Sequence, residues 1–218
     1  MQDVGTGYAG PARARAAVST TTLLGQVMFL VAVALAFTVA GTYIGRDLTD
    51  GTAFILFLVG FGMLLVQGFV ERLRVGTFAI AWLYAIALLI GLGLGPAISY
   101  LVANDPSTVT QAAGATALIT LGLGAGGFAL SKDLSGWMRP LSFVILGCVA
   151  VSFVMLLFSS GGNPILSAII AIVSALLIAV DFNYLRKHGT GDDAVWLATG
   201  IFVSIINIFL SLLNLFSD

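Results

Sequence analysis

One carboxylate lies inside an apolar run. Asp181 follows the mostly apolar residues 172–180 and precedes Arg186 by five positions. An ionised carboxylate at the centre of a membrane helix costs about 2.5–3.5 kcal/mol, so such a residue is by default a candidate for a functional role. A structural interpretation stays open beside it. Five residues are about 7 Å of helix, so Asp181 could instead lie near the membrane surface and pair with Arg186.

Polar side chains also recur at helical spacing near the C-terminus. Asn207 and Asn214 are seven residues apart, and Ser204 lies three residues before Asn207. Because residues at these spacings share one face of a helix, the three side chains are expected on the same side. Buried polar residues of this kind most often make hydrogen bonds between membrane helices.

The sequence has few residues suited to metal binding, catalysis or disulfide formation. His188 has two nearby carboxylates, Asp192 and Asp193, but no second His or Cys, so a zinc site is not expected. We interpret His188 as a loop histidine and the two aspartates as the start of the last helix. No nucleophile and base are paired, both lysines lie in loops, and Cys148 lies in an apolar run. The sequence therefore predicts no enzyme, no cofactor and no disulfide.

Two glycine-rich runs, 91–96 and 122–127, superficially resemble phosphate-binding loops. A phosphate loop needs a preceding strand and a helix N-terminus in water, whereas these runs lie inside apolar segments. Close approach of helix backbones is the better explanation. Gly91 and Pro96 are also expected to kink or break the helix that contains them.

The composition places these residues in a membrane. The chain has 218 residues, of which 59% are hydrophobic and 9% are charged, and its mean hydropathy is +1.09. Nine basic and ten acidic residues are too few to cover a soluble domain of this length. A net charge of −1 without a basic cluster also argues against nucleic acid as a partner.

Seven apolar runs are long enough to cross the hydrocarbon, which takes about 20 residues. They are Thr22–Ile44, Thr52–Val70, Thr77–Val102, Gln111–Leu130, Leu141–Ser159, Pro164–Leu185 and Ala194–Phe216. We therefore expect an all-α integral membrane protein, with residues 1–21 as a flexible cytoplasmic tail and residues 22–218 as one membrane domain. The first run is longer than the h-region of a cleavable signal peptide, so it is expected to remain.

The basic residues predict the orientation. Seven crossings place eight of the nine on one side, and Arg46 alone lies opposite. The eight are Arg13, Arg15, Arg72, Arg74, Lys132, Arg139, Arg186 and Lys187. Since positive residues are retained in the cytoplasm, the N-terminus is expected inside and the C-terminus outside. If one predicted crossing were not real, the basic residues would be spread over both sides of the membrane. The observed asymmetry therefore supports seven crossings independently.

Four segments together resemble the Bax inhibitor-1 family, also called the transmembrane Bax-inhibitor-motif family, and its bacterial members in particular. They are Ser131-Lys-Asp-Leu-Ser135, Ala179-Val-Asp-Phe-Asn-Tyr-Leu185, Ile205-Ile-Asn-Ile-Phe-Leu-Ser-Leu-Leu213 and Gly91–Tyr100. The resemblance covers most of the chain. It implies seven helices, six of them surrounding a central C-terminal helix, in the bacterial inner membrane.

The resemblance also implies a function. Well-studied members hold two hydrogen-bonded aspartates, on the sixth and seventh helices, that sense pH and gate a calcium leak. Asp181 matches the first aspartate, but Ser204 stands where the second is expected. A serine can bond Asp181 but cannot share an acidic proton with it, so pH gating should be weakened. Calcium seeks 6–8 oxygen ligands, so Asp181 is expected to hold it weakly and transiently.

We therefore expect an ion-homeostasis protein of the lipid bilayer, with calcium as the ion. Ser204 is the expected hydrogen-bond partner of Asp181, Asn207 lines the pathway, and Arg72 or Arg74 is the candidate cationic partner. The alternative is a non-conducting regulator of a membrane-bound ATP-dependent protease, because the family includes such a modulator.

Overall fold

The computed structural model describes residues 19–158 and 163–217, and within these ranges the chain is helical without strands. In this described part of the chain, seven helices are long and apolar enough to cross a membrane. They are α1 (Thr20–Gly45), α2 (Asp50–Phe69), α3 (Thr77–Asn104), α4 (Pro106–Ala129), α5 (Met138–Phe158), α6 (Pro164–Lys187) and α7 (Ala194–Phe216). Three short 3-10 helices, Glu71–Leu73, Ser135–Trp137 and Gly191–Asp193, lie in the connections. The predicted all-α fold with seven spans is confirmed.

The largest difference in boundaries is at α4, which begins five residues before the predicted start. Asp105 caps this helix, because its side chain accepts a hydrogen bond from the backbone N–H of Thr108 at 3.2 Å. Pro106 occupies the first helical position, where its missing N–H has no cost. The capping residues therefore extend α4 beyond the strictly apolar run.

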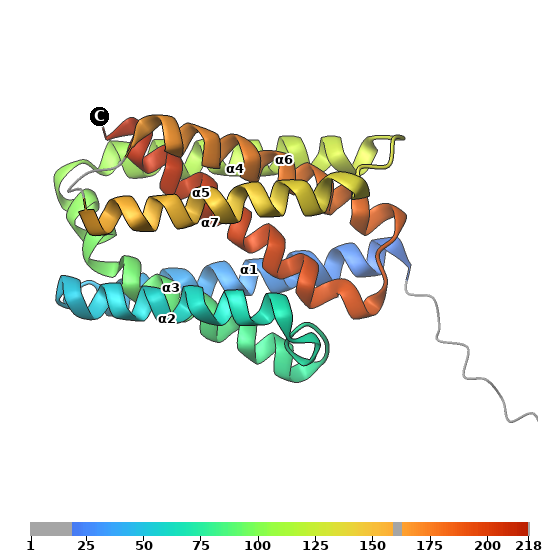
Figure 1. Cartoon of the computed structure of the whole chain (residues 1–218), viewed down its shortest axis with the longest axis horizontal. Helices are drawn as coiled ribbons and strands as arrows, with labels where there is room; N and C mark the ends of the chain where they lie inside the picture. Colours follow the sequence, from blue (N-terminus) through green and yellow to red (C-terminus); the bar gives the residue numbers. More distant parts are fainter. Residues whose placement is uncertain (1–18, 159–162, 218) are drawn as a thin grey trace, which may run out of the picture.

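The bundle is arranged around α7, the span with the largest buried share (Figure 1). This helix packs most extensively against α6, and also against α1 and α4. Helices α2 and α5 lie further out, where α2 packs on α3 and α5 packs on α6. The central place of the C-terminal helix is the arrangement expected from the sequence.

Small residues set the distance between α1 and α3. A Cβ added at Gly91 would overlap the backbone carbonyl of Thr38, and one added at Gly95 would overlap Gly45. The glycines therefore serve close helix packing, as interpreted from the sequence. Of the kink or break predicted near Pro96, the break is wrong, because α3 is one continuous helix from Thr77 to Asn104 with the proline inside it. A kink at this position stays a prediction.

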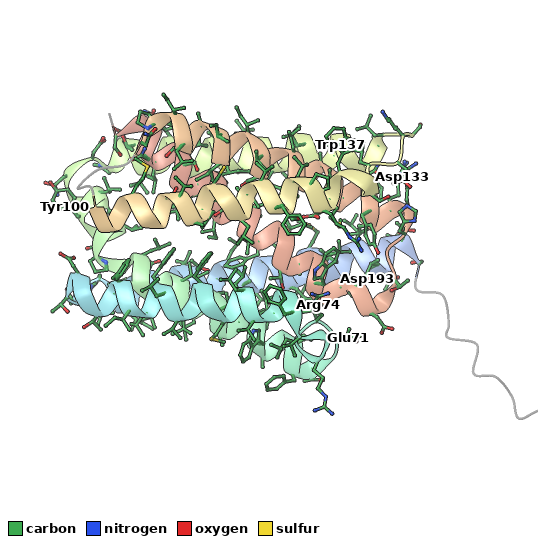
Figure 2. The ribbon with its side chains drawn as sticks, in the orientation of Figure 1. Glu71, Arg74, Tyr100, Asp133, Trp137 and Asp193 are labelled. Atoms are coloured by element: carbon green, nitrogen blue, oxygen red, sulfur yellow. The ribbon has the colours of Figure 1, made fainter. Side chains whose placement is uncertain are left out.

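One end of the bundle, here named the basic end, carries the connections α2–α3, α4–α5 and α6–α7. Among the described residues it includes Arg72, Arg74, Lys132, Arg186 and Lys187. Figure 2 places Arg74, Asp133 and Asp193 toward this end and Tyr100 at the opposite one. That the basic end faces the cytoplasm stays a prediction. The predicted tail falls mostly on residues 1–18, which lie outside the described residues.

Candidate functional site

Asp181 lies inside the bundle, facing α7. Its exposed fraction is 6%, and a Cβ added at Gly200 would lie 3.1 Å from Asp181 Oδ2. The absent side chain at Gly200 therefore lets the carboxylate approach the α7 backbone closely. Ser204 is four residues further along α7, so it lies one turn away on the same face.

Pairing of Asp181 with Arg186 is not seen. Arg186 Nη2 donates to the carbonyl of Leu130 at 2.5 Å, and the guanidinium lies 5.9 Å from the ring centroid of Phe128. Within the described chain, no residue donates a hydrogen bond to Asp181. The ion pair with Arg186 that the sequence left open is therefore not formed, and Asp181 is buried inside the protein.

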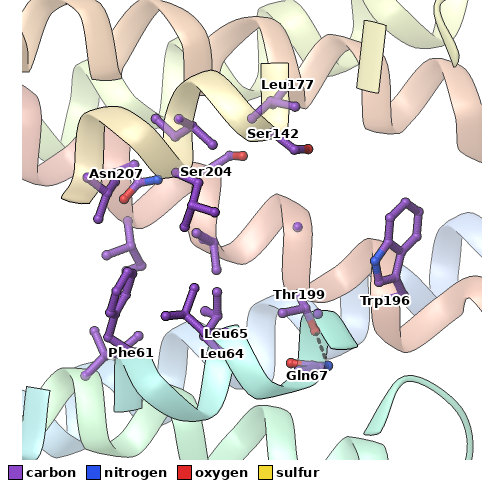
Figure 3. A pocket seen from close by; sticks show the side chains of 18 of the residues that line it. Phe61, Leu64, Leu65, Gln67, Ser142, Leu177, Trp196, Thr199, Ser204 and Asn207 are labelled. Atoms are coloured by element: carbon purple, nitrogen blue, oxygen red, sulfur yellow. Dashed lines mark hydrogen bonds between the residues drawn. The ribbon is translucent and has the colours of Figure 1, made fainter. Parts of the chain in front are cut away.

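A cavity of about 460 Å³ adjoins Asp181. It lies between α7 and the outer helices α2 and α5, with α6 contributing Asp181 (Figure 3). Most of its lining is apolar, and Asp181 is the sole ionisable side chain among the described residues that line it. The other polar side chains of the lining are Gln67, Ser142, Thr199, Ser204 and Asn207.

Asp181, Ser204 and Asn207 thus line one cavity. The expected hydrogen bond between Asp181 and Ser204 is not among the hydrogen bonds of the described residues. The carboxylate packs at the level of Gly200, one turn closer to the basic end than Ser204.

Gln67 contributes an unsatisfied acceptor to the cavity wall. Its Nε2 donates to the Leu73 carbonyl at 3.0 Å and to Thr199 Oγ1 at 3.1 Å, the bond drawn in Figure 3. Thr199 in turn donates to the Val195 carbonyl at 2.8 Å. The Gln67 Oε1 atom is buried without a hydrogen-bond partner among the described residues. A buried amide oxygen without a donor is costly unless something else supplies one.

A second, smaller cavity of about 210 Å³ extends the first toward the end opposite the basic end. The two share the lining residues Phe57, Val149, Asn207 and Leu210, and the second adds Ser152, Ser167 and Ser211. Beyond it, Asn214 Nδ2 donates to Ser167 Oγ at 3.0 Å. Of the polar face of α7 predicted from positions 204, 207 and 214, Ser204 and Asn207 line the cavities, as does Ser211, and Asn214 lies beyond them.

The two candidate arginines lie outside these cavities. Arg72 is exposed, and Arg74 Nε donates to the backbone carbonyl of Gln67 at 3.0 Å. Neither lines either cavity. Arg74 instead fixes the end of α2, and through it the position of the Gln67 side chain.

The two segments at the basic end that resemble the family, Ser131–Ser135 and Ala179–Leu185, are joined by Asn183, a polar residue inside a predicted span. Its Nδ2 lies within hydrogen-bond distance of the carbonyls of Gly127, Leu130 and Lys132, at 3.0–3.2 Å, and its Oδ1 accepts from Leu134 N at 2.8 Å. Asn183 is fully buried. Its position two residues after Asp181, in a segment that resembles the family, was the available signal. The Asn183 side chain in this segment therefore holds a loop.

The same loop is held at its surface by two further groups from the end of α6. The Lys187 ammonium donates to the Ser131 carbonyl, and His188 Nε2 lies 2.7 Å from Asp133 Oδ2. The backbone N–H of Ser135, followed by His188, lowers the pKa of Asp133 to about 2. His188, expected to be only solvated, therefore helps to fix the connection between α4 and α5.

Comparison with known proteins shows which family this chain is related to. The profile of the family described as "Inhibitor of apoptosis-promoting Bax1" matches residues 20–218, which include all seven helices. The chain belongs to the Bax inhibitor-1 family. The match confirms the resemblance seen in the sequence. Asp181 and the cavity beside it therefore belong to a membrane protein of the Bax inhibitor-1 family.

Relatives of this family member occur in several bacteria. An uncharacterized protein of Pseudomonas aeruginosa is 29% identical over 194 residues, covering 86% of this chain and 85% of its own. An uncharacterized membrane protein of Vibrio cholerae is 29% identical over 140 residues, covering 62% of each chain. One from Streptococcus pyogenes serotype M3 is 29% identical over 127 residues, covering 53% of this chain and 54% of its own. Two of these three names describe membrane proteins, in agreement with the seven apolar helices.

Proposed function

We propose that this protein is a cation leak of the bacterial inner membrane, with calcium as the permeating ion and Asp181 as its central ligand. One observation carries the proposal. A buried carboxylate without a hydrogen-bond donor lies on a cavity that continues, along the polar face of α7, into a second cavity. A charge at this depth is costly unless a cation or a proton neutralises it.

The residues that line the two cavities suit the passage of calcium better than its tight binding. Among the described residues there is no group of three or more His, Cys, Asp or Glu side chains that could hold a metal ion. Calcium prefers 6–8 oxygens, including carboxylates, whereas the cavities offer one carboxylate with neutral hydroxyl and amide oxygens. Weak binding at Asp181 favours release, which conduction requires.

The same geometry supports weakened pH gating. Asp181 is the sole ionisable side chain that lines the cavity among the described residues, so no second carboxylate is there to share its proton. Ser204 lies one turn from the Gly200 backbone that Asp181 faces, and Ser204→Asp would add that second carboxylate. We expect the variant to close as a shared proton bridges the pair and to open as the pair ionises.

The test is calcium entry into dye-loaded proteoliposomes between about pH 5.5 and 8. The native protein should admit calcium above the rate of empty liposomes with little dependence on pH, and Ser204→Asp should depend steeply on pH. Flux equal to that of empty liposomes for both proteins would refute the leak.

In that event the non-conducting alternative, regulation of a membrane-bound ATP-dependent protease, gains support. The feature that favours it is the connection between α4 and α5, which Asn183 and His188 hold in one conformation at the basic end. Co-purification with a protease that survives Asp181→Asn but not deletion of residues 1–20 would favour this role. Neither candidate involves catalysis, in keeping with the expectation from the sequence that the protein is not an enzyme.

A further inference from the structure

The cavity at Asp181 has a side opening between α2 and α5. Two of its lining residues, Phe69 on α2 and Phe143 on α5, are 87% and 74% exposed. The helices that carry them pack on α3 and α6 respectively, at the outside of the bundle. In a bundle that spans a bilayer, exposed phenylalanines on outer helices meet lipid. The opening therefore faces the membrane, and an occupant can enter from hydrocarbon.

The polar groups at the inner wall specify the chemistry of that occupant. Asp181 lines the cavity and receives no hydrogen bond from the described chain. Its carboxylate is an acceptor and carries negative charge when ionised. A ligand that satisfies it must donate hydrogen bonds and carry positive charge. The remainder of the wall, including Phe61, Leu65 and Leu146, is apolar and suits a hydrocarbon chain.

From these groups we propose that the cavity binds a lipophilic amine from the bilayer, with its ammonium at Asp181 and its alkyl chain between α2 and α5. The volume, about 460 Å³, lies within the range of roughly 300–1,000 Å³ typical of small-molecule sites. The site does not depend on whether the protein conducts ions.

Two other amphiphiles fit less well. A phospholipid with an ammonium headgroup also carries a phosphate, and no Lys or Arg of the described chain lines the cavity to neutralise it. A fatty acid would bring a second carboxylate toward Asp181, where like charges repel. The site therefore selects a single positive charge without an accompanying acid.

The test is binding of tritiated dodecylamine to the full-length protein in phosphatidylcholine nanodiscs, with empty nanodiscs subtracted. Native protein should bind it saturably at one site per chain. Asp181→Asn, which conserves volume and removes the charge, should weaken binding by about tenfold or more. Asp50→Asn, which removes an exposed carboxylate from the opposite end of α2, is the matched control and should bind as the native protein does.

Competition identifies the ligand chemistry. Dodecyltrimethylammonium keeps the charge but has no N–H, so it should compete less well than unlabelled dodecylamine, and dodecanol and dodecanoate should compete least. Equal competition by dodecanol would reduce the site to an apolar cavity and overturn the proposal. So would equal competition by phosphatidylethanolamine, which would identify a lipid headgroup site.

A second variant keeps the proposal testable if Asp181→Asn fails to fold. Val203 lines the cavity from α7, and Val203→Trp would fill it while leaving the carboxylate in place. This variant should lose saturable binding. Native affinity in Val203→Trp or in a folded Asp181→Asn, or an absence of saturable binding to the native protein, would refute the site. Because binding is measured without an ion gradient, its failure would leave the proposed cation leak untouched.

Discussion

Replacing Asn183 by alanine should release the connection between α4 and α5. The asparagine amide is fully buried and joins α6 to the backbone of residues 127–134. Its two N–H groups are shared among three carbonyls, and its oxygen accepts a bond from Leu134 N. The truncation therefore removes three hydrogen bonds and leaves their backbone partners to find water or remain unpaired.

The size of the effect follows from these bonds. At about 1 kcal/mol each, three hydrogen bonds amount to about 3 kcal/mol of stability. Asn214 provides a matched control, because it is also an asparagine of a membrane helix but donates one hydrogen bond, to Ser167. Asn214→Ala should cost about 1 kcal/mol by the same reasoning.

Hydrogen exchange followed by mass spectrometry measures the difference locally. In Asn183→Ala, the amide of Leu134 should exchange about 100-fold faster than in the native protein, since each 1.4 kcal/mol is a factor of ten. Asn214→Ala should leave that peptide unchanged. If this peptide exchanged at the same rate in all three proteins, Asn183 would not hold the loop. The inference that Asn183 joins the segments 131–135 and 179–185 would then be wrong.

Three further predictions concern packing, pH and the connection between the cavities. Gly91→Ala, whose Cβ would overlap α1, should lower stability by about 1–3 kcal/mol in a denaturation assay, whereas Gly62→Ala, with open space around it, should be neutral or stabilising; equal effects would contradict the packing. The Ser135 N–H lowers the pKa of Asp133 from 3.8 to about 2, so the stability that Asp133 adds is complete above about pH 4 and is lost as pH falls toward 2. The stability gap between native protein and Asp133→Asn should shrink over that interval, and a constant gap would contradict the assignment. Asn207→Leu should reduce calcium entry, because Asn207 lies where the two cavities meet and its polar side chain would be replaced by an apolar one; native flux in this variant would exclude the second cavity from the pathway.

The spans could be predicted from the sequence because the physical signal is strong and local. An apolar run of about 20 residues has few alternatives to a membrane helix, and α7 begins and ends where predicted. Prediction was weaker where polar capping residues extend a helix, as Asp105 does for α4. A break at Pro96 was wrongly predicted: α3 is continuous there, and Gly91 and Gly95 beside the proline lie close against α1, a contact that local sequence does not reveal.

Some features of the candidate site could likewise be predicted from the sequence, and others could not. The shared face of Ser204 and Asn207 follows from helical periodicity, and Asp181 is visible as a charge in an apolar run. The contributions of Gln67 and Gly200 depend on how α2 and α6 meet α7, so spacing within one helix could not indicate them. Arg72 and Arg74 were predicted as cationic partners of Asp181, but they follow the end of α2 without reaching the cavity.

Calcium entry through Asp181→Asn tests the central claim most directly. Native protein, Asp181→Asn and the control Asp50→Asn would be reconstituted at equal density in dye-loaded liposomes, and initial rates compared at one pH. The account predicts that native protein and Asp50→Asn admit calcium alike and that Asp181→Asn falls by about tenfold or more, because the amide cannot neutralise a cation in the cavity. Native rates in a correctly folded Asp181→Asn would contradict it.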